Sequence, residues 1–196
     1  MPDSPDIPDL LRALARVLPR WCDGWYVFGA QAVQAWGTPR LSADVDVTIR
    51  LRSPDLGPFL DAMKAAGSSS RVPDPAAFAR ETRVLPFVHD SSRIPVDAVL
   101  SGPGPEEEFL ARARTISLAG VSVPVISPED LVVTKILAGR PKDLEDVRGI
   151  LRQAGKVFDA ARVASLLGEL ELALGRSDLV VLYEEQRKAV EAGSGR

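Results

Sequence analysis

Two aspartates separated by a single residue are the side chains of this sequence best placed to do chemistry. Asp44 and Asp46 stand in the segment Arg-Leu-Ser-Ala-Asp-Val-Asp-Val-Thr-Ile, residues 40–49, whose apolar members predict a strand. Residues i and i+2 of a strand project from the same face, and two carboxylates held there repel each other unless they share a cation. The spacing therefore predicts a divalent metal site; the alternative is a pair of carboxylates on an exposed strand face.

Asp97 is a third candidate ligand. It interrupts the apolar segment Ile-Pro-Val-Asp-Ala-Val-Leu, residues 94–100, which also predicts a strand. A charge within an apolar strand is costly to bury unless it is paired or bound to metal. If this strand lies beside that of Asp44 and Asp46, three carboxylates converge. Such a triad can hold two Mg²⁺ ions about 4 Å apart, which clamp a phosphoryl group and activate an attacking hydroxyl. An exposed strand face is the alternative for Asp97 also.

Gly29 lies between a short apolar strand, residues 26–28, and a helical segment, residues 31–36. Backbone amides and the helix dipole favour an anion at such a junction. Because glycine has no side chain, a triphosphate could approach the backbone closely. The junction predicts a phosphate-binding turn when it is combined with the acidic pair, although an isolated glycine here would equally fit an ordinary tight turn.

The segments that must position these residues alternate between strand and helix up to residue 126. Strands are expected at 26–28, 45–51, 84–88 and 94–100 and a hairpin at 115–125, with helices at 8–18, 31–36, 55–66 and 106–114 and a polar loop at 68–70. From Ser127, a natural N-cap followed by Pro128, the pattern is helical to residue 190. The sequence therefore predicts an α/β core over 1–126 and a helical C-terminal region over 127–196 that packs on the core.

Composition bounds the possible functions. The chain has 196 residues, of which 45% are hydrophobic, and a net charge of −3 at pH 7. It can form a real core, but it has no global basic field that would attract nucleic acid. The single cysteine, Cys22, rules out a disulfide framework and a cysteine-based zinc site.

No apolar run approaches the ~20 residues of a membrane span, and the acidic N-terminus lacks the features of a secretory signal. We therefore expect a cytoplasmic protein with no membrane partner.

The motifs together resemble the nucleotidyltransferase superfamily of DNA polymerase β type. Its signature is Gly-Ser or Gly-Gly, then Asp-x-Asp, then a lone Asp or Glu; here these are Gly29-Ala-Gln-Ala, Asp44-Val-Asp46 and Asp97. The segment at 127–146 is similar to the AbiEii-like nucleotidyltransferases, which include toxins of type IV toxin–antitoxin systems. Those carry a helical Lys followed by Arg/Lys-Asp-x-x-Asp. The resemblance runs from about residue 27 to 151 and implies a mixed-sheet nucleotidyltransferase core with a helical C-terminal part.

The resemblance implies a role for each matched residue. Asp44, Asp46 and Asp97 would bind Mg²⁺, two ions in all, and Asp97 could also act as the base for the acceptor. Gly29 and Ala30 would lie at the phosphates of the nucleotide. Ala30 departs from the family pattern, because it offers a backbone N–H but no hydroxyl.

Four further residues complete the expected site. Ser42 could supply the hydroxyl that Ala30 lacks, and Arg40 could contact the phosphates or form a salt bridge. The resemblance implies that Lys135 reaches the phosphates as a point charge and that Asp143 orients this lysine or contacts the nucleotide. The alternatives are a solvated helix face for Lys135 and, for residues 142–146, a charged first helical turn.

The expected function is Mg²⁺-dependent transfer of a nucleoside monophosphate from an NTP to a hydroxyl, with release of pyrophosphate. The sequence leaves three classes of acceptor: a tRNA end, a protein hydroxyl, or a small molecule such as an aminoglycoside. The resemblance also implies a toxin-type component with a cognate antitoxin as partner. Five arginines could form a small basic mouth for a tRNA end: Arg50, Arg52, Arg71, Arg80 and Arg83.

Two alternatives remain at this point. A catalytically degenerate module would keep the fold and bind nucleotide or a partner protein without transfer, and the alanine at position 30 favours it. A structural domain with fortuitous carboxylates would show no Mg²⁺-dependent binding of any NTP.

Overall fold

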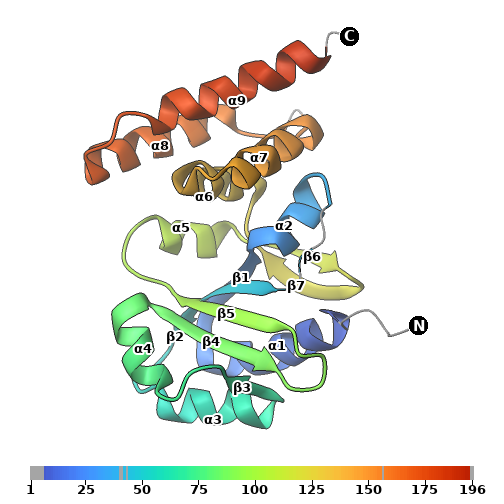
Figure 1. Ribbon diagram of the computed structural model, residues 1–196, viewed down its shortest axis with the longest axis vertical. Coiled ribbons are helices and arrows are strands. Elements are labelled where there is room, and N and C mark those ends of the chain that lie inside the picture. The colour runs from blue at the N-terminus through green and yellow to red at the C-terminus, as the bar shows by residue number, and fades with distance from the viewer. Residues whose placement is uncertain (1–6, 40–41, 43, 156, 195–196) are drawn as a thin grey trace. The chain divides into compact units, whose positions relative to one another are not determined.

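The computed structural model describes residues 7–39, 42, 44–155 and 157–194 (Figure 1). The chain divides into two compact units. The first consists of Met1–Gln31 and Leu41–Ile126, and the second of Ala32–Arg40 and Ser127–Arg196. Residues 32–40, which the sequence pattern assigned to the α/β core, therefore group with the C-terminal helices. Among the described residues, no helix is both long enough and apolar enough to cross a membrane.

The first unit is built on a mixed sheet of seven strands in the order β3-β4-β5-β2-β1-β7-β6. The pairs β2–β5 and β1–β7 are parallel, and the others are antiparallel. This confirms the predicted α/β class and the mixed sheet. The strands are β1 (Cys22–Phe28), β2 (Val45–Leu51), β3 (Ser68–Ser70), β4 (Val84–His89), β5 (Pro95–Leu100), β6 (Arg114–Leu118) and β7 (Val121–Val125).

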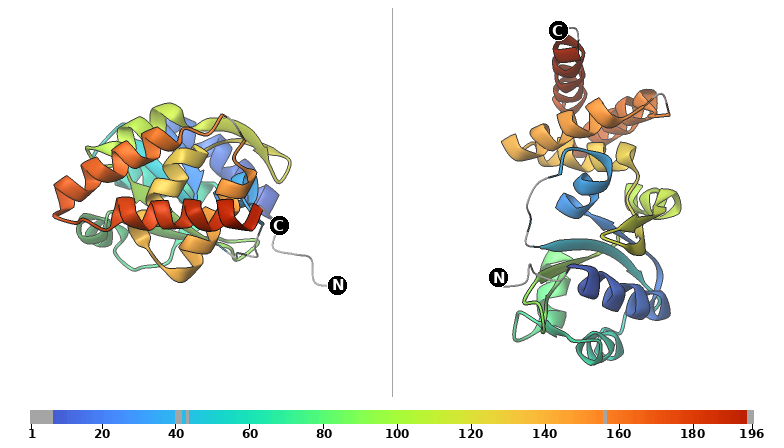
Figure 2. Two further views of the ribbon diagram at one scale, coloured as in Figure 1. Left: turned by 90° about the horizontal axis from the view of Figure 1, so that it is seen from above. Right: turned by 90° about the vertical axis from the view of Figure 1, so that its right-hand side faces the viewer.

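Helices cover the two faces of this sheet unequally. The helix α1 packs against β1 and β7, and α3 contacts both α1 and β3, so these two helices lie on the same face (Figures 1 and 2). The helix α5 lies on the other face against β1. The helices that begin in this unit are α1 (Ile7–Trp21), α2 (Gly29–Trp36), α3 (Gly57–Ala65), α4 (Pro75–Thr82) and α5 (Pro105–Arg112).

Alternation along β2 explains which residues face each layer. Val45, Val47 and Ile49 have no exposed surface, whereas Asp46 is half-buried and Arg50 is exposed. Successive side chains of a strand point to opposite faces. The valines and isoleucine therefore face the layer of α1 and α3, and the charged residues face the side on which α5 lies.

Two elements differ from the sequence prediction. Residues 68–70, expected as a polar loop, form the edge strand β3 beside β4. The helix α4 was not predicted; it begins after Asp74, whose carboxylate accepts a hydrogen bond of 2.8 Å from the Ala77 N–H. The expected hairpin is confirmed as β6 and β7, which turn at Ala119 and Gly120.

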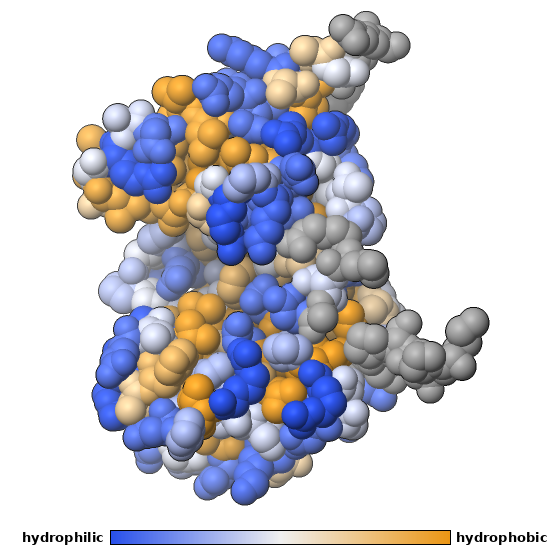
Figure 3. Space-filling view, viewed as in Figure 1, coloured by the Kyte–Doolittle hydropathy of each residue, from blue (hydrophilic) through white to orange (hydrophobic). Residues whose placement is uncertain are grey.

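The second unit contains α6 (Pro128–Ala138), α7 (Pro141–Gln153), α8 (Ala160–Leu174) and α9 (Leu179–Ser194). The predicted start of α6 is confirmed, because the Ser127 hydroxyl accepts the Asp130 N–H at 3.1 Å. Helices α8 and α9 form a hairpin (Figure 2). Hydrophobic side chains are visible on this part of the surface (Figure 3), where Leu172, Leu174 and Val181 are 88%, 53% and 58% exposed.

Residues 32–40 are attached to α7 by close backbone contacts. The Gln153 side-chain amide donates to the Gly37 carbonyl at 2.8 Å. A Cβ on Gly149 would lie 3.0 Å from the Thr38 backbone nitrogen. Gly149 therefore allows residues 32–40 to approach the helix.

This contact generates a prediction about stability. Gly149→Ala should lower the free energy of unfolding by about 1–3 kcal/mol, because the added methyl group meets backbone rather than a flexible side chain. The matched control is Gly168→Ala in α8, where a Cβ would meet nothing within 4 Å. That substitution should stabilise the protein by about 0.5–1 kcal/mol through helix propensity. Urea unfolding measures both, and equal effects of the two substitutions would contradict the tight contact.

Candidate active site

Asp46 and Asp97 are brought together by the parallel pairing of β2 and β5. They are direct partners in the register of these strands, so their side chains project from the same face of the sheet. This is the face that carries Arg50, opposite α1 and α3. Both residues are half-buried.

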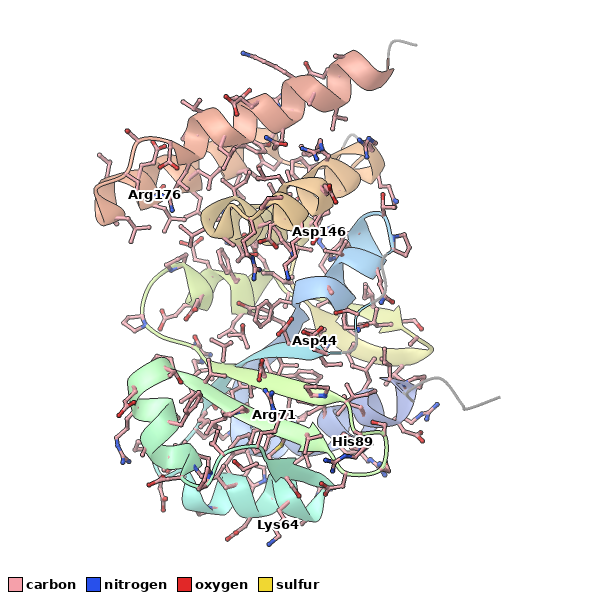
Figure 4. All side chains as sticks on the ribbon, in the orientation of Figure 1. Asp44, Lys64, Arg71, His89, Asp146 and Arg176 are labelled. Carbon is pink, nitrogen blue, oxygen red and sulfur yellow. The ribbon has the colours of Figure 1, made fainter. Side chains whose placement is uncertain are left out.

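Asp44 lies immediately before β2 and is exposed (Figure 4). Its carboxylate accepts a hydrogen bond from the Ser42 hydroxyl. Its backbone carbonyl accepts a hydrogen bond of 3.1 Å from the side-chain amide of Gln31, a residue that is only 1% exposed. Gln31 therefore fixes the start of β2 to the first turn of α2. Sequence reasoning missed this role, and the only available signal was a polar residue two positions after the glycine turn.

Gly29 begins α2 with a φ of +62°. A Cβ at this position would overlap the Asp46 carboxylate, lying 2.9 Å from its Cγ. The glycine is therefore required twice, by the left-handed backbone and by the carboxylate beside it. Ala30, the next residue, is 4% exposed, so its methyl group is buried.

Arg71 is the cationic partner of Asp97. The two side chains form an ion pair in which they remain 37% and 40% exposed, respectively. The Arg71 N–H donates to the Pro86 carbonyl at 2.9 Å, and Pro86 is the partner of Asp97 in the β4–β5 register. Arg71, one of the five arginines predicted to form a small basic mouth, thus lies next to the candidate metal ligand Asp97.

The three carboxylates are not gathered into one cluster in this arrangement. Within the described ranges, no three His, Cys, Asp or Glu side chains stand close enough together to hold a metal ion. Asp44 is instead hydrogen-bonded to Ser42, and Asp97 is paired with Arg71. The carboxylate oxygens and the shared face of Asp46 and Asp97 fit Mg²⁺, which prefers oxygen ligands. Mg²⁺ binding by the three residues stays a prediction.

A second charged group lies in the second unit. The Lys135 ammonium donates to Asp143 Oδ1 at 2.9 Å and to Asp146 Oδ2 at 2.7 Å. Lys135, Asp143 and Asp146 are 6%, 0% and 5% exposed. The alternative of a solvated lysine is therefore wrong. Asp143 does lie in the first turn of α7, but it is buried against Lys135, whereas Lys142 and Glu145 are exposed. Sequence reasoning did not assign a site role to Asp146.

Arg140 is a second cation in this group and pairs with Asp143. Its Nε donates to Asp143 Oδ2 at 2.5 Å and its Nη2 to Asp143 Oδ1 at 3.3 Å. Burial alone would raise the pKa of Asp143, but hydrogen bonds from Arg140 and Lys135 and the charges of both outweigh burial and lower it. Two cations face two carboxylates, so the group offers a nucleotide no net positive charge. Only one of the three ammonium N–H groups of Lys135 is not directed at these carboxylates.

The predicted site residues thus fall into two sets. Gly29, Ala30, Ser42 and the three candidate metal ligands belong to the first unit, and Lys135 and Asp143 to the second. Arg40 lies outside the described residues. A role of Lys135 at the phosphates held by the first unit stays a prediction.

A family model matches this chain, and solved structures are similar to it in fold. The family model described as "Nucleotidyl transferase AbiEii toxin, Type IV TA system" matches residues 12–191. No curated protein matches the chain. The solution structure of the antibiotic-resistance factor ANT(2'')-Ia is similar in fold, with 14% identity, a TM-score of 0.50 and coverage of 96% of this chain and 95% of that one. An antigenic nucleotidyltransferase-like protein from Paracoccidioides brasiliensis has 18% identity, a TM-score of 0.50 and coverage of 89% and 88%.

The contact between Gly29 and Asp46 generates a prediction. Gly29→Ala should lower the free energy of unfolding by about 1–3 kcal/mol, because it strains the positive φ and overlaps the carboxylate. The same substitution in an Asp46→Ala background should cost less, since only the backbone strain and a Cβ contact are left. Urea unfolding of the four proteins gives the coupling between the two positions. A coupling of zero would mean that Asp46 does not restrict position 29.

The lowered pKa of Asp143 predicts a dependence of stability on pH. The stabilisation from its ionised carboxylate is fully present above the ordinary Asp pKa of about 3.9, and it is lost as pH falls through the lower pKa of the folded state. Asp143→Asn should lower the free energy of unfolding at pH 7 by about 3 kcal/mol, because it leaves buried cations with fewer partners. The variant should also lose less stability than the native chain as the pH falls below about 3.9.

Urea unfolding at a series of pH values tests this dependence. The matched control is Asp178→Asn, which removes the partner of Arg176 from an exposed pair and should change stability little. Parallel pH profiles of the native chain and Asp143→Asn would show that Asp143 does not carry the effect.

Proposed function

Because the chain belongs to the AbiEii nucleotidyl transferase family, we propose that it transfers a nucleoside monophosphate from an NTP to a hydroxyl group and releases pyrophosphate. The observation that carries this proposal is the register that sets Asp46 beside Asp97, with Gly29 and the start of α2 against Asp46. In-line displacement at phosphorus depends on positioning and charge neutralisation. Carboxylates on rigid strands would position Mg²⁺, which supplies the neutralising charge, and the glycine turn at a helix N-terminus would position the phosphates.

Each residue of the first unit would have a defined part in the reaction. Asp44, Asp46 and Asp97 would hold Mg²⁺, which when bound neutralises phosphate charge and lowers the pKa of the attacking hydroxyl. The backbone amides after Gly29 would donate to the triphosphate. The acceptor oxygen would form a bond to the α-phosphorus while the bond to pyrophosphate breaks, and its proton would pass to the Asp97 carboxylate.

Lys135 would act through its remaining ammonium N–H. Asp143 and Asp146 hold the other two N–H groups, so the lysine is fixed in direction and cannot swing freely. In this proposal it donates one hydrogen bond to a phosphate oxygen. Asp143 and Asp146 act as positioning residues, and their loss would disturb nucleotide binding through the lysine.

The family description supports a toxin-type role with a cognate antitoxin as partner. The acceptor hydroxyl belongs to one of three classes: a tRNA end, a protein or a small molecule such as an aminoglycoside. Each class can be supplied separately in one assay, so activity and acceptor can be determined together.

The proposal predicts that transfer depends on Asp46. The protein is incubated with Mg²⁺, each α-labelled NTP in turn, and either total RNA, total protein or an aminoglycoside. Label should appear on one acceptor class, and Asp46→Ala should slow its appearance by about 10²–10³-fold, the usual loss of one electrostatic contact to a transition state. Asp61→Ala, which removes an exposed carboxylate of α3, should leave the rate unchanged.

Two results would contradict this proposal. Equal rates for Asp46→Ala and Asp61→Ala would remove Asp46 from the reaction. Metal-dependent binding of an NTP with no release of pyrophosphate in any mixture would instead support the degenerate binding module, for which Ala30 is the structural reason. Thermal unfolding of each variant confirms that a loss of rate does not reflect a loss of fold.

A further inference from the structure

A cavity of about 440 Å³ lies in the first unit, apart from the candidate carboxylates. It is bordered by the last residues of β2 and β5, by residues 52–56 and by α4. Because β2 and β5 are parallel, their carboxyl ends reach the same edge of the sheet. Clefts outside the carboxyl ends of strands are common ligand sites in α/β sheets. The volume falls within the range of about 300–1,000 Å³ that is typical of small-molecule pockets.

The lining combines apolar surface with positive charge. The half-buried leucines Leu51, Leu56 and Leu100 contribute its apolar part. Four arginines contribute to the same lining: Arg50, Arg52, Arg80 and Arg83. Among the residues known to line the cavity, none is acidic. Arg52 is paired with Asp23, so the other three arginines give the lining its positive charge in a chain whose net charge is −3. This chemistry suits an anion with an apolar body.

Two of the arginines build the walls of the cavity. Arg52 donates to the Asp23 carboxylate at 3.1 Å and to the carbonyls of Arg20 and Pro19 at 3.1 and 3.2 Å. Arg83 donates to the Ser101 carbonyl at 2.7 Å and to the Leu100 carbonyl at 3.1 Å. These bonds fix both guanidinium groups against the backbone.

The backbone conformation at Arg83 is uncommon for a residue other than glycine. Arg83 ends α4 with a φ of 62°, in the left-handed region. Glycine is the residue that adopts this conformation with least strain at a helix end. An arginine at this position keeps its guanidinium at the end of β5, where it borders the cavity.

The other two arginines can reach a ligand. Arg50 comes from β2 and Arg80 from α4, and both are exposed. Within the described part of the chain, no hydrogen bond or ion pair engages either guanidinium. Planar guanidinium groups match the oxygens of a phosphate and bind it through paired hydrogen bonds.

We propose that this cavity is a second ligand site, which takes a phosphorylated molecule of about the size of a nucleotide. Arg50 and Arg80 hold the phosphate, and the three leucines contact the apolar face of the base. A free phosphate would leave the leucines uncovered, and an uncharged apolar ligand would leave the two arginines without a partner. The same chemistry is present in a mononucleotide and in the 5'-phosphorylated end of an RNA strand. The site does not depend on the carboxylates or on the proposed transfer reaction.

The test is equilibrium binding in EDTA, because removal of divalent metal keeps the carboxylate site from contributing. Isothermal titration calorimetry compares AMP, adenosine and a 5'-phosphorylated RNA trinucleotide. AMP should bind at least about tenfold more tightly than adenosine, and Arg50→Ala and Arg80→Ala should each weaken AMP binding about tenfold, as expected for charged hydrogen bonds. Arg16→Ala, which removes an exposed arginine of α1, should leave the affinity unchanged.

Further variants separate binding from folding. Arg50→Lys and Arg80→Lys keep the charge but lose the planar fork, so they should restore only part of the affinity. Tighter binding of the trinucleotide than of AMP assigns the site to an RNA end, and the reverse order assigns it to a free nucleotide. The proposal is overturned if AMP shows no saturable binding without metal, if adenosine binds equally well, or if the double variant Arg50→Ala/Arg80→Ala matches the native chain while remaining folded.

Discussion

The parallel pairing of β2 with β5 is the constraint on which the rest of the first unit depends. At one end of the pair it sets Asp46 beside Asp97, and at the other it brings the carboxyl ends of both strands to the arginine-lined cavity. A slip of one residue would turn Asp46 toward the layer of α1 and α3. The buried alternation of Val45, Val47 and Ile49 prevents such a slip, because each would lose its place in the core. Apolar residues that do no chemistry therefore hold the chemical residues in position.

Asp97 in the first unit and Asp143 and Asp146 in the second all have cationic partners, but these pairs differ in how firmly they are held. The side chains of the Arg71–Asp97 pair are 37% and 40% exposed, and a pair so open to water contributes only about 0–1 kcal/mol. Asp97 can therefore exchange Arg71 for another cation at little cost. The pairs of Lys135 with Asp143 and Asp146 are buried, and removing one partner of a buried pair costs about 3–5 kcal/mol. The first arrangement suits a site that must accept a metal ion, and the second suits a fixed support.

The sequence predicted those features that depend on local pattern. The strands of Asp46 and Asp97, the cap of α6 by Ser127 and the glycine at position 29 all follow from periodicity or from backbone requirements of neighbouring residues. The partners of Arg71 and Gln31 could not be predicted, since both contacts join residues distant in the sequence. The strand β3 was missed because three serines carry no apolar alternation. The burial of Asp146 had a signal that was overlooked, because Asp143, Asp146, Val147 and Ile150 share one face of α7 at helical spacing.

The grouping of residues 32–40 with the C-terminal helices has a consequence for the order of assembly. During synthesis on a ribosome, the strands of the first unit emerge well before α7, which supplies the contacts of Gly37 and Thr38. Residues 37 and 38 thus lack this packing partner until α7, which begins at residue 141, has been made. Domains generally fold as units once their sequence is complete. A nascent chain would accordingly acquire the packing of residues 32–39 against α7 later than the pairing of β1 with β2.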